Sequence, residues 1–221
     1  MSDPAASKYS TARQHMVESQ LQPNEVNNEA VVKAMGAVAR EVFVPKALRA
    51  TAYVDEDLPL GSGRFLMEPR VFGRLIQAAA ITKESSVLDI GCATGYSAAV
   101  LSKMANSVVA VDDSDFAAQA EKNLAVLDIH NVAVVAGKLD EGVQGQGHFD
   151  VIIVEGAISD VPQALLNLLE DGGRLLCVKL YGVVGRAHMV TRRGDAFSPV
   201  DLFDAAVEAL PGMVKEVGFV F

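Results

Sequence analysis

The sequence has no tryptophan, little cysteine and no long apolar run. Its two cysteines among 221 residues are Cys92 and Cys177, and they form neither a metal-ligand spacing nor a disulfide framework. No apolar run approaches the roughly 18 residues of a membrane span. The first residues lack the apolar core of a secretory signal. These absences exclude disulfide-rich secreted proteins and membrane-spanning proteins, and they predict a cytoplasmic protein without a metal site.

Basic residues are also scarce relative to acidic ones. The chain has 19 Lys and Arg against 28 Asp and Glu, a formal net charge of −9. Binding a phosphate backbone requires a basic face, so we expect no nucleic-acid partner and no membrane partner. An anionic substrate stays compatible with this charge, because local groups set the potential inside a cleft. Half of the residues are hydrophobic, as in globular domains.

The chain changes character near residue 80. Before it, amphipathic helical pieces alternate with segments punctuated by proline and glycine, and Asn28 is a predicted helix start. We expect residues 1–80 to form a helical extension with a loop over residues 59–70 and no sheet. Residues 81–221 are expected to form one compact domain.

Short apolar runs alternate with helix-length segments in this second part. Uniformly apolar strands suit a parallel sheet buried on both faces, and the alternation predicts a doubly wound α/β fold. The tail is expected to add one or two strands around a helix near 199–209. The candidate strands are residues 86–91, 107–113, 132–137, 149–156 and 173–180, and the candidate helices are 96–105, 114–127 and 161–171.

The turn after the first of these strands carries the most specific pattern. Gly91, Ala93 and Gly95 are two apart, with Asp89 two residues before them. A dinucleotide fingerprint needs glycine at its first, third and sixth positions, where Ala93 and Tyr96 break it, so a nucleotide-dependent oxidoreductase is disfavoured. Small residues let a ligand approach the backbone. The spacing with a leading acid is typical of methyltransferase cofactor loops, since a carboxylate can meet the ammonium of S-adenosylmethionine.

Asp112 ends the next predicted strand, 21 residues after Gly91. A carboxylate at that strand end can accept hydrogen bonds from both ribose hydroxyls, and Asp113 is a second candidate for this role. The alternative is that the two acids only cap the following helix. Further candidates for cofactor contact are Cys92, Tyr96 and Glu155, the last at the carboxyl end of its predicted strand.

Several segments together carry a resemblance to a known family, namely residues 16–21, 40–45, 52–53, 58–63, 149–154 and 169–175 with the cofactor turn. On these segments, residues 12–195 resemble the protein-L-isoaspartate O-methyltransferases. The resemblance implies a Rossmann-like class I fold with S-adenosylmethionine as cofactor and S-adenosylhomocysteine as product. It also implies methyl transfer to isoaspartyl carboxylates, so that the partner is a protein or peptide with a free carboxylate.

The sequence departs from the family in the loop that faces the acceptor. Where the family has Gln-Thr-Ile-Ser-Gln-Pro, this chain has residues 64–69, and Phe65 and Met67 replace the two hydroxyls. Arg64 or Arg70 could grip the acceptor carboxylate through two parallel hydrogen bonds. The alternative is that both arginines are surface charges.

A second departure lies where the family's Gly-Asp-Gly faces adenine. This chain has Gly137-Lys138-Leu139 there, with Asp140 or Glu141 as a candidate replacement for the acid. Two interpretations therefore stay open: an active methyltransferase, with the family's acceptor or another, and a cofactor-binding protein that has lost catalysis and acts through a partner. The sequence predicts no oligomeric state.

Overall fold

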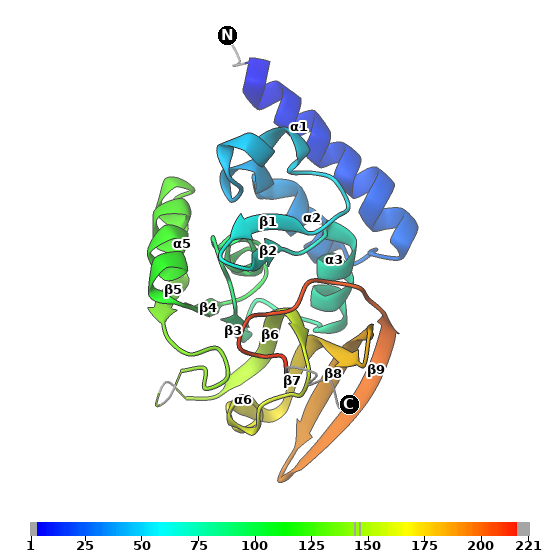
Figure 1. Cartoon of the computed structure of the whole chain (residues 1–221), viewed down its shortest axis with the longest axis vertical. Coiled ribbons are helices and arrows are strands. Elements are labelled where there is room, and N and C mark those ends of the chain that lie inside the picture. Colours follow the sequence, from blue (N-terminus) through cyan, green and yellow to red (C-terminus); the bar gives the residue numbers. More distant parts are fainter. Residues whose placement is uncertain (1–3, 144, 146, 216–221) are drawn as a thin grey trace, which may run out of the picture.

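The computed structural model describes residues 4–143, 145 and 147–215, and its centre is a seven-stranded sheet of order β5-β4-β3-β6-β7-β8-β9 (Figure 1). Strands β3 to β7 pair parallel with one another, whereas β8 pairs antiparallel with both β7 and β9. The predicted parallel sheet is therefore present, with an antiparallel edge. The strands are β3 (Ser86–Ile90), β4 (Ser107–Asp112), β5 (Val132–Ala136), β6 (Phe149–Ile158), β7 (Leu169–Tyr181), β8 (Val184–Arg193) and β9 (Ala196–Asp204).

Both faces of the sheet are buried against helices. One apolar cluster contains Val87 and Ile153 of the sheet together with apolar residues of α3, α4 and α5. A second cluster joins Leu88 and Ile152 to Leu165 of α6 on the opposite face. Successive residues of a strand point to opposite faces, so the continuous apolar runs supply both clusters. The helices are α3 (Pro69–Ala78), α4 (Tyr96–Ser102), α5 (Ser114–Val126) and α6 (Gln163–Asn167).

Helices dominate the chain before the sheet, as predicted. The Asn28 side chain accepts hydrogen bonds from the N–H groups of Ala30 and Val31 and so begins α2, which confirms the predicted helix start. Met16 and Val31 belong to the same apolar cluster as the sheet residues. The elements are α1 (Pro4–Met16), α2 (Glu29–Ala37), a π-helical turn (Val17–Leu21) and 3₁₀ turns at Gln22–Asn24, Arg40–Val42 and Lys46–Thr51.

The predicted loop over residues 59–70 is wrong in part, because it contains a hairpin. Strands β1 (Leu58–Gly61) and β2 (Arg64–Leu66) pair antiparallel. Strands of three or four residues are too short to show an alternating pattern. The hairpin turns through three consecutive left-handed residues, Gly61, Ser62 and Gly63, with φ of 100°, 50° and 72°, which two glycines make accessible.

The predicted helix near 199–209 is also wrong. Residues 196–204 form β9, which folds back on β8 through a turn at Gly194, where φ is 60°. β9 is the edge strand and contains Pro199, a residue that sheets tolerate at edges. The helix expected over 161–171 is shorter, because β7 already begins at Leu169. The part of the predicted tail over residues 216–221 lies outside the described residues.

After β9 the chain returns across the carboxyl end of β6, as the red segment in Figure 1 shows. We call residues 205–213 the C-terminal segment. Ala157 of β6 donates to Glu208 O and accepts from Leu210 N, both at 2.9 Å, and Ser159 N donates to Met213 O at 3.1 Å. These bonds fasten the segment over the edge of the sheet where ligands bind in α/β folds.

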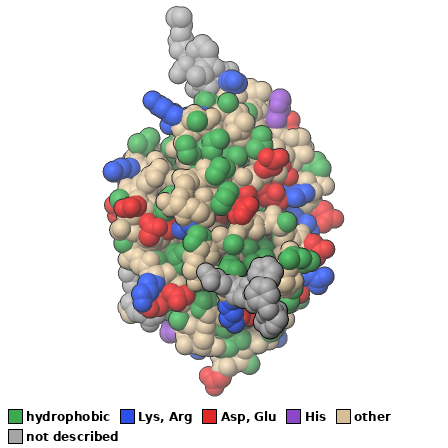
Figure 2. Space-filling model, in the orientation of Figure 1, with side chains coloured by type: hydrophobic (Ala, Val, Ile, Leu, Met, Phe, Trp, Pro, Cys, Tyr) green, Lys and Arg blue, Asp and Glu red, His purple; other side chains and the backbone are tan. Residues whose placement is uncertain are grey.

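The surface drawn in Figure 2 carries acidic and basic side chains interspersed among apolar ones. Lys and Arg side chains are scattered over this face and do not merge into one basic area. In the described part of the chain, none of the helices is long and apolar enough to cross a membrane.

The placement of the C-terminal segment predicts an intolerant glycine on β8. A Cβ added to Gly185 would lie 2.3 Å from Ala205 O, whose residue also donates to Gly185 O at 3.0 Å. We expect Gly185→Ala to lower the free energy of unfolding by about 1–3 kcal/mol through overpacking. Urea denaturation measures this loss.

The matched control is Gly36→Ala in α2, where the added Cβ would meet Val17 Cγ2 at an ordinary 3.6 Å. This change is expected to be neutral or to stabilise by up to about 1 kcal/mol, because alanine favours helix. Equal effects of the two substitutions would contradict the path described for the C-terminal segment.

Candidate active site

The turn between β3 and α4 brings the backbone close to several side chains. Gly91, Ala93 and Gly95 have φ of 83°, 46° and 95°, so all three predicted small positions are left-handed. Gly91 N donates to Val111 O at 2.8 Å, which holds the turn against the end of β4. A Cβ on Gly95 would lie 3.1 Å from Ala120 Cβ of α5. The turn therefore needs small residues both for its conformation and for helix packing.

Asp89 lies beneath this turn with no exposed surface. Its Oδ2 accepts from Ser97 Oγ at 2.7 Å, while Oδ1 has no hydrogen-bond partner among the described residues. Burial raises the pKa of Asp89 to about 7, and the neighbouring Asp112 carboxylate adds to that rise. A buried carboxylate oxygen without a donor is a site that a cationic group can fill.

Asp112 is also fully buried, and four donors converge on it. Arg64 Nη1 donates to Oδ1 at 2.5 Å, and Arg64 Nη2 donates to Oδ2 at 2.8 Å. The backbone N–H groups of Asp113 and Ala93 donate to the same two oxygens at 2.8 and 2.6 Å. The side chain is therefore no solvated helix cap.

Arg64 is the first residue of β2, and its side chain is buried rather than exposed on a loop. Besides Asp112, its Nη2 donates to Gly91 O at 2.7 Å, and its guanidinium carbon lies 5.4 Å from the centre of the Phe116 ring. Arg70 lies elsewhere: it is in the first turn of α3 and pairs with Glu68 at 2.8 Å. The structure thus separates the two arginines that the sequence left as alternatives.

A groove of about 270 Å³ opens beside Asp112. Leu139 lines it together with Gly137 and Asp140. Lys138 also lines the groove, but its ammonium is exposed and pairs with Glu141 at 2.7 Å. The Asp113 carboxylate contributes to the groove while it caps α5, accepting from the N–H groups of Asp115 and Phe116.

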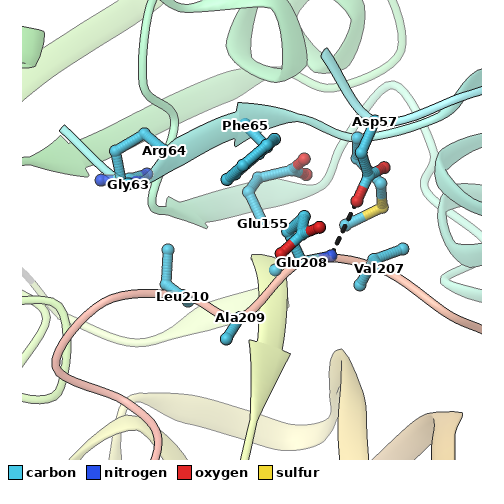
Figure 3. A pocket seen from close by; sticks show the side chains of 11 residues that line it. Asp57, Gly63, Arg64, Phe65, Glu155, Val207, Glu208, Ala209 and Leu210 are labelled. Atoms are coloured by element: carbon cyan, nitrogen blue, oxygen red, sulfur yellow. Dashed lines mark hydrogen bonds between the residues drawn. The ribbon is translucent and has the colours of Figure 1, made fainter. Parts of the chain in front are cut away.

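A second cleft lies between the hairpin and the C-terminal segment, on the other side of Arg64 (Figure 3). Phe65, Met67, Glu155 and Leu210 line it, and Figure 3 shows Glu155 beside Phe65. Its cavity volume is about 10 Å³, roughly the space of a single water. The acceptor-loop position Met67 therefore lines a cleft that the protein's own side chains nearly fill.

Glu155, Cys92 and Tyr96 lie close to the turn with different surroundings. Glu155 Oε1 is enclosed without a hydrogen-bond partner among the described residues, and burial with the Asp89 charge raises the pKa of Glu155 well above its usual range. Burial likewise raises the pKa of the Cys92 thiol, which keeps it protonated. Tyr96 packs at ring-centroid distances of 5.7 Å from Phe43 and 5.9 Å from Phe72. Tyr96 is therefore a core residue of the helical part.

Two functional positions escaped the sequence analysis. Asp57 accepts from the N–H groups of Glu68 and Glu208, both at 2.7 Å, and so joins the hairpin flank to the C-terminal segment. Buried Arg40 donates from Nη2 to Met67 O at 2.7 Å and holds the acceptor loop. Arg40 lies in a segment that carried the family resemblance, so the sequence offered a signal for it. No pattern in the sequence marked Asp57.

The residues present suit S-adenosylmethionine in its methionine half. The free oxygen of Asp89 matches an ammonium, and the left-handed turn offers its backbone. For the ribose half, Asp112 is a suitable acceptor, but the Arg64 guanidinium already donates to both of its carboxylate oxygens. Among the described residues, no group of three or more His, Cys, Asp or Glu is arranged to hold a metal ion.

Comparison with known proteins gives a consistent family. The family model described as Protein-L-isoaspartate(D-aspartate) O-methyltransferase matches residues 11–197. The protein-L-isoaspartate O-methyltransferase of Synechococcus sp. is 40% identical over 176 residues, covering 79% of this chain and 70% of that one. The one of Methanoculleus marisnigri is 34% identical over 199 residues, covering 85% and 90%.

Solved structures share the fold. A structure titled protein-L-isoaspartate O-methyltransferase superposes with a TM-score of 0.80 at 24% identity, covering 90% of this chain and 66% of that chain. A beta-aspartate methyltransferase from Plasmodium falciparum, in complex with S-adenosyl-L-homocysteine, gives a TM-score of 0.75 at 19% identity, covering 90% and 97%. These neighbours confirm the predicted Rossmann-like class I fold.

The buried Arg64–Asp112 pair predicts a large stability effect. Asp112→Asn leaves the guanidinium buried without its counter-charge, so we expect the free energy of unfolding to fall by roughly 3–5 kcal/mol. Asp113→Asn is the matched control next in sequence, because asparagine caps a helix as well as aspartate. Chemical denaturation of both variants compares them, and equal losses would contradict the pairing.

Proposed function

This chain belongs to the protein-L-isoaspartate(D-aspartate) O-methyltransferase family, and we propose from that membership that it methylates the carboxylate of isoaspartyl residues in proteins or peptides, with S-adenosylmethionine as donor. The observation that carries the proposal is the pair of buried carboxylates, Asp89 and Asp112, at the ends of neighbouring parallel strands beside a left-handed turn. The Asp89 carboxylate beneath the turn would disfavour a dinucleotide pyrophosphate there.

Each cofactor residue has a role that its surroundings support. Asp89 would meet the cofactor ammonium through its free oxygen. The backbone of the turn at Gly91 would contact the methionine part of the cofactor, and Asp112 would accept hydrogen bonds from the ribose hydroxyls. Adenine would lie against Leu139, an apolar side chain that lines the groove. Lys138 points its charge to Glu141, so we assign it no contact with the base.

The acceptor is expected to be ionised already, so the reaction needs no general base. The bound cofactor supplies an electrophilic methyl on its sulfonium. The protein's part is alignment and exclusion of water, which together lower a barrier by roughly 7–11 kcal/mol in well-oriented reactions. The cleft around Met67 and Glu155 has a volume of only about 10 Å³, so little water could share it with an acceptor.

Glu155 offers a replacement for the hydroxyls that Phe65 and Met67 lack. Its raised pKa keeps the carboxyl protonated further up the pH scale than an exposed glutamate. A protonated carboxyl donates a hydrogen bond and does not repel an anion. This would let an acceptor carboxylate enter a cleft that two further carboxylates, Asp57 and Glu208, also line.

A second candidate function is cofactor binding without catalysis, in which the protein acts through a partner. The missing hydroxyls at Phe65 and Met67 and the small cleft volume favour it. We also propose a cytoplasmic location and no nucleic-acid partner, which the two free, buried cysteines and the acidic net charge support.

The deciding experiment is transfer of labelled methyl from S-adenosylmethionine to an isoaspartyl peptide, compared with its aspartyl twin. We expect base-labile methyl ester on the isoaspartyl peptide alone. Labelling of neither peptide by a protein that binds S-adenosylhomocysteine would exclude the isoaspartyl acceptor. Binding of neither cofactor form would exclude the methyltransferase function itself.

Cofactor affinity is expected to depend on pH through Asp89. With a pKa of about 7 in the free protein, Asp89 must lose its proton to meet the ammonium. Binding is therefore weaker at low pH, approaching about a tenfold loss per pH unit well below pH 7, and it changes by only about twofold from pH 7 to 8. The ionisable groups that face Asp89 are Asp112, Arg64 and Glu155. The pair of Arg64 with Asp112 is neutral overall, and the raised pKa of Glu155 favours its uncharged form.

Calorimetric titration of S-adenosylhomocysteine between pH 5.5 and 8 checks this dependence. Asp89→Asn should weaken binding and remove the slope, because an amide has no proton to lose. Affinity independent of pH in the unsubstituted protein would contradict the assignment of Asp89 to the ammonium.

A further inference from the structure

Arg64 and a bound ribose need the same two oxygens. An ionised carboxylate offers about four lone-pair sites, and four donors already reach Asp112: two from Arg64 and one each from the backbone of Ala93 and Asp113. The backbone donors are fixed by the turn and by the start of α5. A pair of ribose hydroxyls can therefore bond to Asp112 only where the guanidinium now lies.

The same guanidinium also covers the turn itself. Arg64 Nη2 donates to Gly91 O at 2.7 Å, and a Cβ built on Gly91 would stand 3.1 Å from this nitrogen and from Leu210 Cδ1. The surface along which a cofactor would pass the glycine is thus in contact with two side chains of the protein. Both come from elements outside the sheet, the hairpin and the C-terminal segment.

A displaced Arg64 side chain would find other carboxylates in the adjoining groove. Arg64 lines the 270 Å³ groove together with the carboxylates of Asp113 and Asp140. Asp113 uses Oδ1 to cap α5, which leaves its other oxygen for a guanidinium. Release from Asp112 therefore need not leave the arginine charge buried and unpaired.

We propose, on the basis of the cofactor assigned above, that Arg64 sets the cofactor affinity of this protein by competing with the ribose for Asp112. In the free protein the guanidinium holds the acceptor and closes the turn. Cofactor binding displaces it from both places. The apparent affinity is the intrinsic affinity multiplied by the fraction of free molecules in which Arg64 has already left Asp112.

Isothermal titration with S-adenosylhomocysteine tests the competition by affinity alone. Arg64→Gln removes the competitor and should bind at least about tenfold more tightly than the unsubstituted protein. Arg186→Gln is the control: this arginine is half-exposed on β8 and pairs with Asp201 and Asp204, away from the turn. We expect no change for it.

The outcomes separate the two proposals. Binding by the unsubstituted protein with equal or weaker binding by Arg64→Gln overturns the competition and leaves the proposed function standing. Absence of S-adenosylhomocysteine binding in every variant overturns the cofactor assignment and the competition with it.

The unsubstituted protein decides the question if Arg64→Gln does not fold. In a crystal structure with S-adenosylhomocysteine, we expect the ribose hydroxyls on Asp112 and the guanidinium beyond the ion-pair distance of about 4 Å. An intact Arg64–Asp112 pair beside bound ligand would overturn the proposal.

Discussion

The site depends on an excess of buried carboxyl groups over buried cations at the ends of β3 and β4. Parallel pairing places Asp89 and Asp112 at neighbouring strand ends, both fully buried, and Glu155 joins them from β6. A single guanidinium, that of Arg64, pairs with Asp112 there. Asp89 stays partly uncompensated and has a pKa of about 7. Burying acids this way is unfavourable for a fold alone, and the arrangement is understandable as a place kept for a cationic ligand.

The strands of the parallel sheet could be predicted because each contains a short apolar run bounded by turn residues. The turn between β3 and α4 could be predicted equally well, because the small residues Gly91, Ala93 and Gly95 correspond to its three left-handed positions. The hairpin was missed because its strands have only four and three residues. The strand β9 was taken for a helix because its pairing with β8 is tertiary, and local sequence does not record a partner.

The role of Arg64 lay beyond the sequence for a related reason. It is separated from Asp112 by 48 positions, and its residue type is consistent with a loop charge, an acceptor clamp or a buried ion pair. Only the angle of the hairpin, set in part by Asp57, decides among these. Residues that match the family motif, such as Gly91, could be predicted from the sequence. The role of Arg64, which differs from the family residue, could be seen only in the three-dimensional structure.

The hydrogen bond between Asp57 and Glu208 spans 151 positions. A chain leaving the ribosome exposes the hairpin and the glycine turn long before residue 208 is synthesised, and domains fold progressively from the amino terminus. The cleft side of the site therefore stays open on the nascent chain until Glu208 has emerged. Closure of the site by the C-terminal segment then follows synthesis of the sheet strands, so the sheet can fold before the cleft is complete.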